Sequence, residues 1–212
     1  MKKENKLKIL IDLDSTIINT SKMIINLHNK LNPNNKIEYI EDCGWKFEPM
    51  IKTKEELSEL FKLFDHKDFY NDVIYTKNAK EVIDKMSKGY EVVICSKHND
   101  SRKPITKKFI DKEFPNCNLV FVDNFEDKAK IDCDFIIDDK IECLKGFNNK
   151  DTVRICFGKY QWNKEYKGIK YCDWKEIYNC IESINKARND YRFRHYKLKE
   201  VFVNEVHNNW IL

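Results

Sequence analysis

Residues 7–16 read LKILIDLDST, an apolar run that ends at two aspartates, Asp12 and Asp14, in a polar turn. An uninterrupted apolar run of this length suits a strand that is buried on both faces of a parallel sheet. Ligands of such sheets bind beyond the carboxyl ends of the strands. Of two carboxylates placed there, one can act as nucleophile and metal ligand, and the other as general acid and base. For this pair alone, a purely structural role in the turn is the simpler alternative.

Further apolar runs suit buried strands, at residues 91–95, 118–122, 134–138 and 152–157. Segments with helical spacing lie between or after them, at residues 78–88, 102–113, 139–146 and 174–186. Strands that alternate with helices favour a parallel sheet covered by helices on both faces. The sequence therefore predicts an α/β fold with a doubly wound parallel sheet.

Residues 18–73 break this alternation because they contain no strong strand pattern. Two stretches within them, 18–31 and 54–64, have the spacing of amphipathic helices, and an irregular aromatic segment lies between the two. We interpret this part of the chain as a helical cap inserted after the first strand. The expected organisation is an α/β core at residues 1–17 and 74–186, a cap at 18–73 and a C-terminal helical extension at 187–212.

The composition is that of a globular protein, since 42% of the 212 residues are hydrophobic and 35% are charged. The net charge of +4 is too small to indicate nucleic-acid binding. Residues 186–199 hold six Lys or Arg, and a solvated helical face explains them more simply than contacts with a phosphate backbone. We therefore expect no nucleic-acid partner.

The eight cysteines form no Cys-x-x-Cys pair, which argues against a zinc site. Cys95 and Cys156 lie inside apolar runs, where a free cysteine acts as a small buried hydrophobe. The N-terminal residues contain no apolar stretch suited to a signal peptide, and no window reaches the ~18 apolar residues of a membrane span. These features predict a cytoplasmic protein without a membrane partner.

Asp138 and Asp139 form a second acidic pair at the end of an apolar run, in FIIDD. Like charges that are close and half-buried repel each other and raise each other's pKa unless a cation is present. Carboxylates at two strand ends suit Mg²⁺, which prefers oxygen ligands. A helix N-cap is the alternative role for Asp139 and leaves the role of Asp138 unchanged.

Two further polar residues lie near strand ends. Ser96 follows the run VVIC, and its hydroxyl could donate to a phosphate oxygen. Lys128 precedes the last acidic strand and could neutralise both a phosphate and a nucleophilic carboxylate, with Lys130 as a competitor for this role. In a chain so rich in lysine, a solvated surface position is the simpler alternative for either one.

Taken in order, these signals resemble the four motifs of the haloacid dehalogenase superfamily of phosphohydrolases. ILIDLDSTI is similar to the first motif, VVICS to the second, Lys128 to the third and FIIDD to the fourth, and the resemblance covers residues 7 to about 186. Within the superfamily, the chain looks most like the cytosolic 5′(3′)-deoxyribonucleotidase family. The closer likeness rests on the insertion between the first and second motifs, on the short interval from Lys128 to Asp138, and on the segments RICFGKYQWN and CDWKEI.

The resemblance implies that Asp12 attacks phosphorus and forms an aspartyl-phosphate. Asp14 then protonates the leaving alcohol and later deprotonates the hydrolytic water. Mg²⁺ is implied as the cofactor, held by Asp12, the backbone carbonyl of Asp14, and Asp138. Asp139 completes the acidic set by orienting a metal-bound water or the lysine of the third motif. Ser96 and Lys128 are implied to hold the remaining phosphate oxygens.

Candidates to stack on a base of the substrate are the aromatic residues of the cap, namely Trp45, Phe47, Phe69 and Tyr70. Packing within the cap is the alternative role for each of them. Lys97, next to the serine of the second motif, is a further candidate for substrate contact. His98 follows closely and could approach the site, but we expect an exposed loop residue.

These observations predict an Mg²⁺-dependent phosphomonoesterase that acts on a small substrate, foremost a (deoxy)nucleoside monophosphate. The alternatives are a phosphatase of another small metabolite or of a nucleic-acid end, and a non-catalytic binding protein on the same fold. A homodimer is left open. Ser15, where animal members of the family have Gly, and the loop SKHND, which also differs from theirs, bear on the substrate more than on the chemistry.

Overall fold

The computed structural model describes residues 6–208 apart from 42, 45–46, 48–49 and 149–150, with side chains described up to residue 191. The chain forms two compact units, one within residues 1–175 and the other within residues 176–212. The first unit contains the sheet, the predicted cap segment and the described candidate site residues. The second holds most of the long C-terminal helix.

The strands of the first unit form one sheet, with bounds β1 (Lys8–Ile11), β2 (Glu91–Ser96), β3 (Asn118–Phe121), β4 (Phe135–Asp138), β5 (Val153–Phe157) and β6 (Ile169–Tyr171). The strand order is β3-β2-β1-β4-β5-β6, and every neighbouring pair is parallel. The predicted α/β fold with a parallel sheet is confirmed. The short β6 was missed, because its three residues are only half-buried and carry no long apolar run.

The helices are α1 (Thr20–Leu31), α2 (Lys54–Lys62), α3 (Ala79–Gly89), α4 (Lys103–Glu113), α5 (Ile141–Lys145) and α6 (Trp174–Asn208). Short 3₁₀ turns add η1 (Leu63–Asp65), η2 (Phe125–Lys130) and η3 (Gln161–Asn163). Each expected helix is present to within a few residues at its ends. α6 runs without a break through the predicted helix at 174–186 and into the predicted extension. Among the described helices, none is long and apolar enough to cross a membrane.

The core explains why the central strands read as continuous apolar runs. Ile9, Leu10 and Ile11 of β1 have no exposed surface, because β2 and β4 flank this strand and side chains from both faces are covered. Full burial of one such side chain contributes roughly 1.5–3 kcal/mol. All eight cysteines are free, and Cys95 and Cys156 lie in the core as expected.

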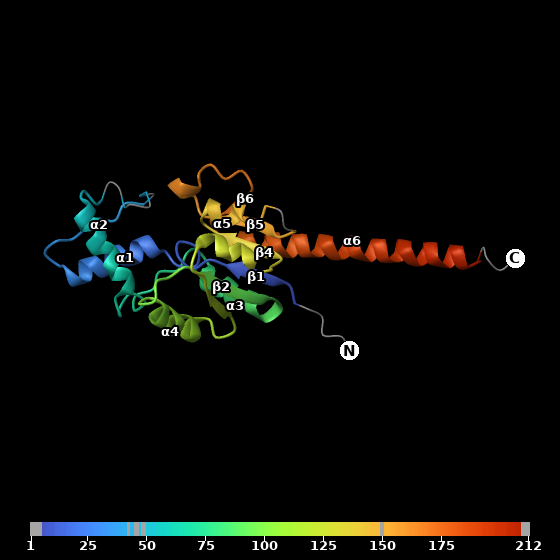
Figure 1. Cartoon of the computed structure of the whole chain (residues 1–212), viewed down its shortest axis with the longest axis horizontal. Coiled ribbons are helices and arrows are strands. Elements are labelled where there is room, and N and C mark those ends of the chain that lie inside the picture. Colours follow the sequence, from blue (N-terminus) through green and yellow to red (C-terminus); the bar gives the residue numbers. More distant parts are fainter. Residues whose placement is uncertain (1–5, 42, 45–46, 48–49, 149–150, 209–212) are drawn as a thin grey trace. The chain divides into compact units, whose positions relative to one another are not determined.

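The segment between β1 and α3 holds α1, α2 and η1, and Figure 1 shows α1 and α2 side by side. A capping box at Thr53 and Glu56 starts α2. The two ends of the segment are tied together, since the Asn19 N–H donates to the Ile74 carbonyl at 2.7 Å. The segment therefore leaves and rejoins the core at one place. The predicted boundaries of core, cap and extension stay a prediction.

Candidate active site

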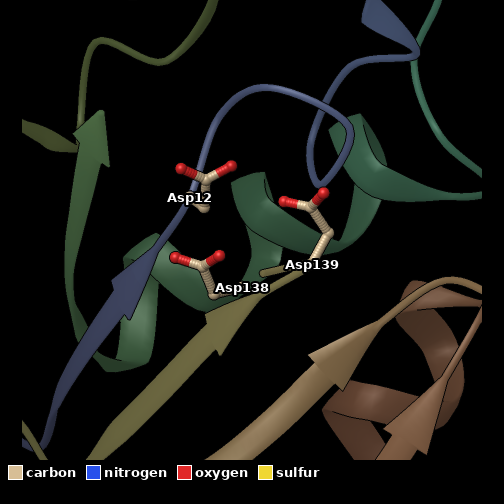
Figure 2. Close-up of side chains that lie close together, drawn as sticks. All are labelled: Asp12, Asp138 and Asp139. Atoms are coloured by element: carbon tan, nitrogen blue, oxygen red, sulfur yellow. The ribbon is translucent and has the colours of Figure 1, made fainter. Parts of the chain in front are cut away.

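Three buried carboxylates meet at the carboxyl edge of the sheet. Asp12 follows β1, whereas Asp138 ends β4 and Asp139 follows it, so the pairing of these two strands brings them together. The Asp12 N–H donates to the Ile137 carbonyl at 2.9 Å, which fixes the loop after β1 against β4. One oxygen from each carboxylate lies within 4.8 Å of the others. Figure 2 shows the three side chains lying close together.

Lys128 lies between two of these carboxylates. Its Nζ atom is 2.5 Å from Oδ1 of Asp12 and 2.7 Å from Oδ2 of Asp138, and the side chain is 1% exposed. The turn η2 carries the lysine and starts with a capping box at Asn124 and Asp127. Burial of an ammonium group is unfavourable, but two carboxylates outweigh it and raise the pKa of Lys128 well above its ordinary value.

The acidic cluster is not neutralised by this one lysine. Burial raises the pKa of Asp12, and the charges of Asp138 and Asp14 raise it further, although Lys128 opposes the shift. Burial also raises the pKa of Asp139 well above its ordinary value, with repulsion from Asp12 and Asp138 as the next causes. Oxygen ligands that repel one another at this spacing fit a hard divalent cation such as Mg²⁺.

Asp139 is held by residues from distant parts of the chain. The Trp162 indole Nε1–H donates to its Oδ2 at 2.7 Å, and the Thr16 hydroxyl donates to its Oδ1 at 3.3 Å. The Trp162 ring stacks on Tyr160 with centroids 4.5 Å apart. Lys140, rather than Asp139, occupies the N-cap position of α5. Sequence reasoning missed Trp162 as a site residue, although it lies in the segment RICFGKYQWN that carried part of the family resemblance.

Asp14 is surrounded by hydrogen-bond donors. Arg102 forms a two-pronged pair with it, at 2.7 Å from Nη2 to Oδ1 and 2.9 Å from Nη1 to Oδ2. The Thr20 hydroxyl donates to Oδ1 at 2.8 Å, and His98 Nε2 lies 2.8 Å from Oδ2. A carboxylate offers about four lone-pair positions, so these partners fill its capacity.

The electrostatics of Asp14 differ from those of the other acids. Burial alone would raise the pKa of Asp14, but the Arg102 guanidinium and the His98 contacts outweigh burial and hold that pKa far below its usual range. The same pairing overcomes desolvation and raises the pKa of Arg102. Asp14 is therefore ionised in this arrangement, which is the form that accepts a proton.

The expectation that His98 is an exposed loop residue is wrong. The residue is 7% exposed, and its ring contacts Asp14 and Ser96 through Nε2 and Thr106 through Nδ1. Burial lowers the pKa of His98, against the opposing effect of Asp14, so the ring is neutral at neutral pH. The polar stretch SKHND looked like a solvated loop because Asp14 lies far away in the sequence and Thr106 lies on α4.

Ser96 and Lys97 end up in different surroundings. Ser96 closes β2, is 2% exposed, and places its Oγ atom 3.0 Å from His98 Nε2. Lys97 is exposed and lies over the Phe125 ring at 4.8 Å. Lys140 lies over the same ring at 3.3 Å. Phe125 was not among the candidates that the sequence suggested.

A cavity of about 330 Å³ opens above these groups. Its lining combines the acidic cluster, Asp14, Ser96, Lys128 and Arg102 with three aromatic side chains, Phe64, Phe125 and Trp162. Lys97 also lines it.

The cap aromatics suggested by the sequence have other neighbours. Phe47 and Phe69 are 4% and 2% exposed and pack against Phe61 and Phe64 respectively. Tyr70 stacks on Phe109 of α4 with centroids 4.5 Å apart. None of these three is among the side chains that line the cavity in the described part of the chain. Trp45 lies outside the described residues.

Arg102 connects the predicted cap segment to the carboxylate of Asp14. Its guanidinium lies 4.9 Å from the ring centroids of both Phe64 and Phe69, and Nη2 donates to the Tyr70 hydroxyl at 3.1 Å. Cation–π contacts of a desolvated guanidinium contribute up to about 2 kcal/mol. Sequence reasoning did not identify Arg102, since it was placed only as the first residue of an expected helix.

The arrangement suits phosphoryl transfer. One carboxylate, Asp12, lies beside a lysine and a group of potential metal ligands, while a second, Asp14, has a separate environment that sets a different pKa. Carboxylates whose surroundings push their pKa values apart can divide nucleophilic and acid–base roles between them. Ser96 ends β2, which pairs with β1, and Lys128 contacts Asp12 directly.

Comparison with known proteins gives a family. The family model described as 5′ nucleotidase, deoxy (Pyrimidine), cytosolic type C protein matches residues 5–189. No curated protein matches the chain significantly.

Solved structures share the fold. A candidate haloacid dehalogenase-type hydrolase from Bacillus subtilis, solved with magnesium bound, is 14% identical, with a TM-score of 0.52, over 84% of this chain and 99% of its own. A haloacid dehalogenase-superfamily hydrolase from Geobacter sulfurreducens is 11% identical, with a TM-score of 0.55, over 82% and 99%. A candidate phosphatase from Clostridium difficile is 14% identical, with a TM-score of 0.54, over 86% and 99%. At these identities the likeness concerns the fold alone.

Proposed function

The chain belongs to the cytosolic type C 5′-nucleotidase family and is therefore a phosphoric monoester hydrolase, and from this premise we propose that it dephosphorylates (deoxy)nucleoside monophosphates through an aspartyl-phosphate on Asp12. The observation that carries the proposal is the meeting of Asp12, Lys128 and Asp138 at the sheet edge, beside a separately tuned Asp14.

Mg²⁺ is the proposed cofactor. Asp12, Asp138 and Asp139, together with the Asp14 backbone carbonyl, would hold it. When bound, it would offset the repulsion between the carboxylates and a dianionic phosphate. The raised pKa values of Asp12 and Asp139 support this part of the proposal, because they report carboxylates that need more positive charge than Lys128 supplies.

Asp12 acts as the nucleophile in the proposed first step. Its carboxylate attacks phosphorus in line, and the bond to the leaving alcohol breaks while the bond to Asp12 forms. Lys128 stabilises negative charge on the phosphoryl oxygens, and the Ser96 hydroxyl donates to them. Both groups are buried and already oriented, so little reorganisation is needed when substrate binds.

Asp14 transfers the protons. Asp14, which is ionised before substrate binds, first takes up a proton from solvent and donates it to the leaving oxygen. It then accepts a proton from the water that hydrolyses the aspartyl-phosphate, which restores the protonated form for the next cycle. Because Thr20, His98 and Arg102 occupy its lone-pair positions, one of these donors must give way before Asp14 can carry a proton. We propose that substrate entering the cavity displaces that donor.

The leaving group would lie among the aromatic side chains of the cavity. Phe64 comes from the cap segment, Phe125 from the turn after β3 and Trp162 from the turn after β5. Stacking of a base on one aromatic ring contributes on the order of 1–3 kcal/mol. This arrangement supports a nucleotide substrate, and the family description supports a cytoplasmic location.

A substrate panel tests the proposal. Phosphate release is measured with Mg²⁺ for deoxy- and ribonucleoside monophosphates, sugar phosphates and a 5′-phosphorylated oligonucleotide. The proposal expects the highest kcat/KM for nucleoside monophosphates. Turnover of sugar phosphates without turnover of any nucleotide would contradict the substrate class while leaving the phosphatase chemistry in place. Preference for the oligonucleotide would favour a nucleic-acid end as substrate.

A further inference from the structure

A closed ring of hydrogen bonds includes Asp14 and passes through Tyr70 of the cap segment. It runs from Arg102 to Tyr70 at 3.1 Å, from Tyr70 to Thr106 at 2.9 Å and from Thr106 to His98 Nδ1 at 3.0 Å. It closes on Asp14, which contacts both His98 and Arg102. The members are largely buried, so the direction of each bond can be worked out from the number of protons available.

Arg102 sets the direction at one end. A guanidinium only donates, so the Tyr70 hydroxyl must accept from it. Burial raises the pKa of Tyr70 to about 12, so the hydroxyl keeps its proton. In the described part of the chain the acceptor within reach of that proton is Thr106 Oγ1, at 2.9 Å. Thr106 therefore receives this bond and directs its own single proton to His98 Nδ1.

Asp14 sets the direction at the other end. The Asp14 oxygens already accept from Arg102 and Thr20, so the remaining contact is best made by an N–H of His98 Nε2 that donates to Oδ2 of Asp14. The contacts of both nitrogens thus require the same form of His98, in which Nε2 is protonated and Nδ1 is unprotonated. The two requirements come from different contacts, since one passes through Tyr70 and Thr106 and the other comes from Asp14 in the loop after β1.

Ser96 is affected by the same proton. Its Oγ atom lies 3.0 Å from His98 Nε2, and a protonated Nε2 cannot accept the Ser96 hydroxyl proton. Ser96 Oγ can accept a hydrogen bond from the imidazole of His98 but cannot donate one to it, so the hydroxyl proton of Ser96 is free to point away from His98. Ser96 lines the cavity, where a phosphate oxygen could accept that proton.

We propose that His98 is a positioning residue, fixed as the neutral Nε2–H tautomer, that orients both the Asp14 carboxylate and the Ser96 hydroxyl for catalysis. The catalytic part of this inference rests on the proposed function, whereas the tautomer does not. Through Tyr70 and Thr106, the orientation of both groups also depends on the cap segment being in place. Because hydrogen-bond partners would fix the tautomer of a purely structural histidine as well, the positioning role needs a test of its own.

Nitrogen NMR of the ligand-free protein, with histidine labelled, tests the tautomer. The chain has five histidines, and the His98→Gln variant identifies the signals of His98. The proposal expects a protonated Nε2 and an unprotonated Nδ1 at neutral pH. A proton on Nδ1, a fully protonated ring or a mixture of tautomers would overturn it. This measurement needs no substrate, so its failure is distinct from failure of the proposed function.

Kinetics test the positioning role. Glutamine can offer an amide N–H near the position of Nε2–H, whereas leucine offers none. We expect His98→Gln to keep most of the wild-type kcat/KM and His98→Leu to lose about tenfold or more, as for the loss of one buried hydrogen bond. His28→Leu, on α1 and outside the contacts of Asp14, is the control. Equal activity of the two His98 variants, with both folded by circular dichroism, would overturn the role.

The link to the cap segment has its own variant. Thr106→Val removes the proton that Nδ1 accepts, whereas Thr106→Ser keeps it. The valine variant should change the Nδ1 signal and lower kcat/KM, and the serine variant should restore both. An unchanged Nδ1 signal in Thr106→Val would show that Thr106 does not donate to His98, and would overturn the proposed link between the cap segment and the tautomer.

Discussion

Arg102 holds Asp14 by two parallel hydrogen bonds of 2.7 and 2.9 Å, across a gap of 88 positions in the sequence. The guanidinium is in turn covered by aromatic rings of the segment between β1 and α3. The carboxylate of Asp14 and the aromatic packing of this segment are therefore joined by one side chain. This pairing explains why the pKa of Asp14 is lowered despite burial, whereas burial raises the pKa values of Asp12 and Asp139.

Two replacements of Arg102 should separate the effect of its positive charge from that of its two-pronged hydrogen bonding to Asp14. Arg102→Met leaves a buried carboxylate without its partner, and we expect a loss of about 3 kcal/mol in unfolding free energy, together with a fall in kcat/KM. Arg102→Lys should fall between wild type and Met, because an ammonium group keeps the charge but not the fork. Urea unfolding and steady-state kinetics measure both effects.

Lys103→Met provides the matched control, since Lys103 is the next residue and pairs only with the exposed Asp100 among the described groups. Its effect on stability should stay within about 0.5 kcal/mol. An Arg102→Met protein as stable and as active as wild type would refute a structural or catalytic role for the pair.

Removal of one charge from the acidic cluster should stabilise the metal-free protein. Because the pKa of Asp139 is raised on folding, its ionised form is disfavoured in the folded state at neutral pH. Asp139→Asn should therefore raise the Tm measured in chelator, by about 2–4 °C for each kcal/mol gained. The same variant should lose most of the further rise in Tm that Mg²⁺ produces in the wild type.

Asp111→Asn is a suitable control, because Asp111 lies on α4 and is paired with the exposed Lys107. It should change neither Tm in chelator nor the response to Mg²⁺. If Mg²⁺ raises the Tm of wild type and Asp139→Asn equally, Asp139 has no part in holding the ion.

Trp162 should tune the same site through its indole N–H. Trp162→Phe retains a ring over Tyr160 but removes the donor to Asp139. Loss of such a supporting hydrogen bond typically lowers metal affinity about 10–100-fold, and we expect a fall of at least tenfold here. The apparent affinity is read from activity as a function of Mg²⁺ concentration.

Tyr160→Phe keeps the stacked pair and removes the bond from the Tyr160 hydroxyl to the Ser15 carbonyl. It therefore separates the indole N–H from general packing around Trp162. We expect Tyr160→Phe to have the Mg²⁺ dependence of the wild type. The prediction fails if Trp162→Phe has that same dependence.

Ser15 adopts a backbone conformation that favours glycine. Its φ angle is 60°, in the left-handed region, where a residue with a Cβ is less stable by roughly 1–2 kcal/mol. Ser15→Gly should therefore be more stable than Ser15→Ala by about 1 kcal/mol in urea unfolding. Both variants lose the hydroxyl, so their difference reports the backbone. Equal stability of the two would contradict a strained turn after β1.

The sequence predicted what depends on local pattern. The continuous apolar runs identified the five longer strands, and the polar residues at their ends identified Asp12, Ser96 and Asp138 as neighbours. The family resemblance is confirmed over most of the chain. Lys128 was recognised through its place in the motif order, since one lysine among so many carries little signal by itself.

The residues that were missed gain their roles from long-range contacts. His98, Arg102 and Trp162 sit in polar or mixed stretches without periodicity, and their partners come from other elements. Phe64 rather than Phe47, Phe69 or Tyr70 lines the cavity, because the direction of a helix face cannot be fixed before the helix is packed. One signal was available for His98, namely the departure of SKHND from the loop of animal relatives.

The most direct test of the central claim is chemical trapping of the enzyme during turnover. Wild type is mixed with Mg²⁺ and a deoxynucleoside monophosphate that carries radiolabelled phosphate, quenched in acid, digested and mapped. The proposed mechanism predicts hydroxylamine-sensitive label on the peptide that contains Asp12, and no label or turnover in Asp12→Asn. Retained turnover in Asp12→Asn, or label on a different residue, would contradict Asp12 as the nucleophile.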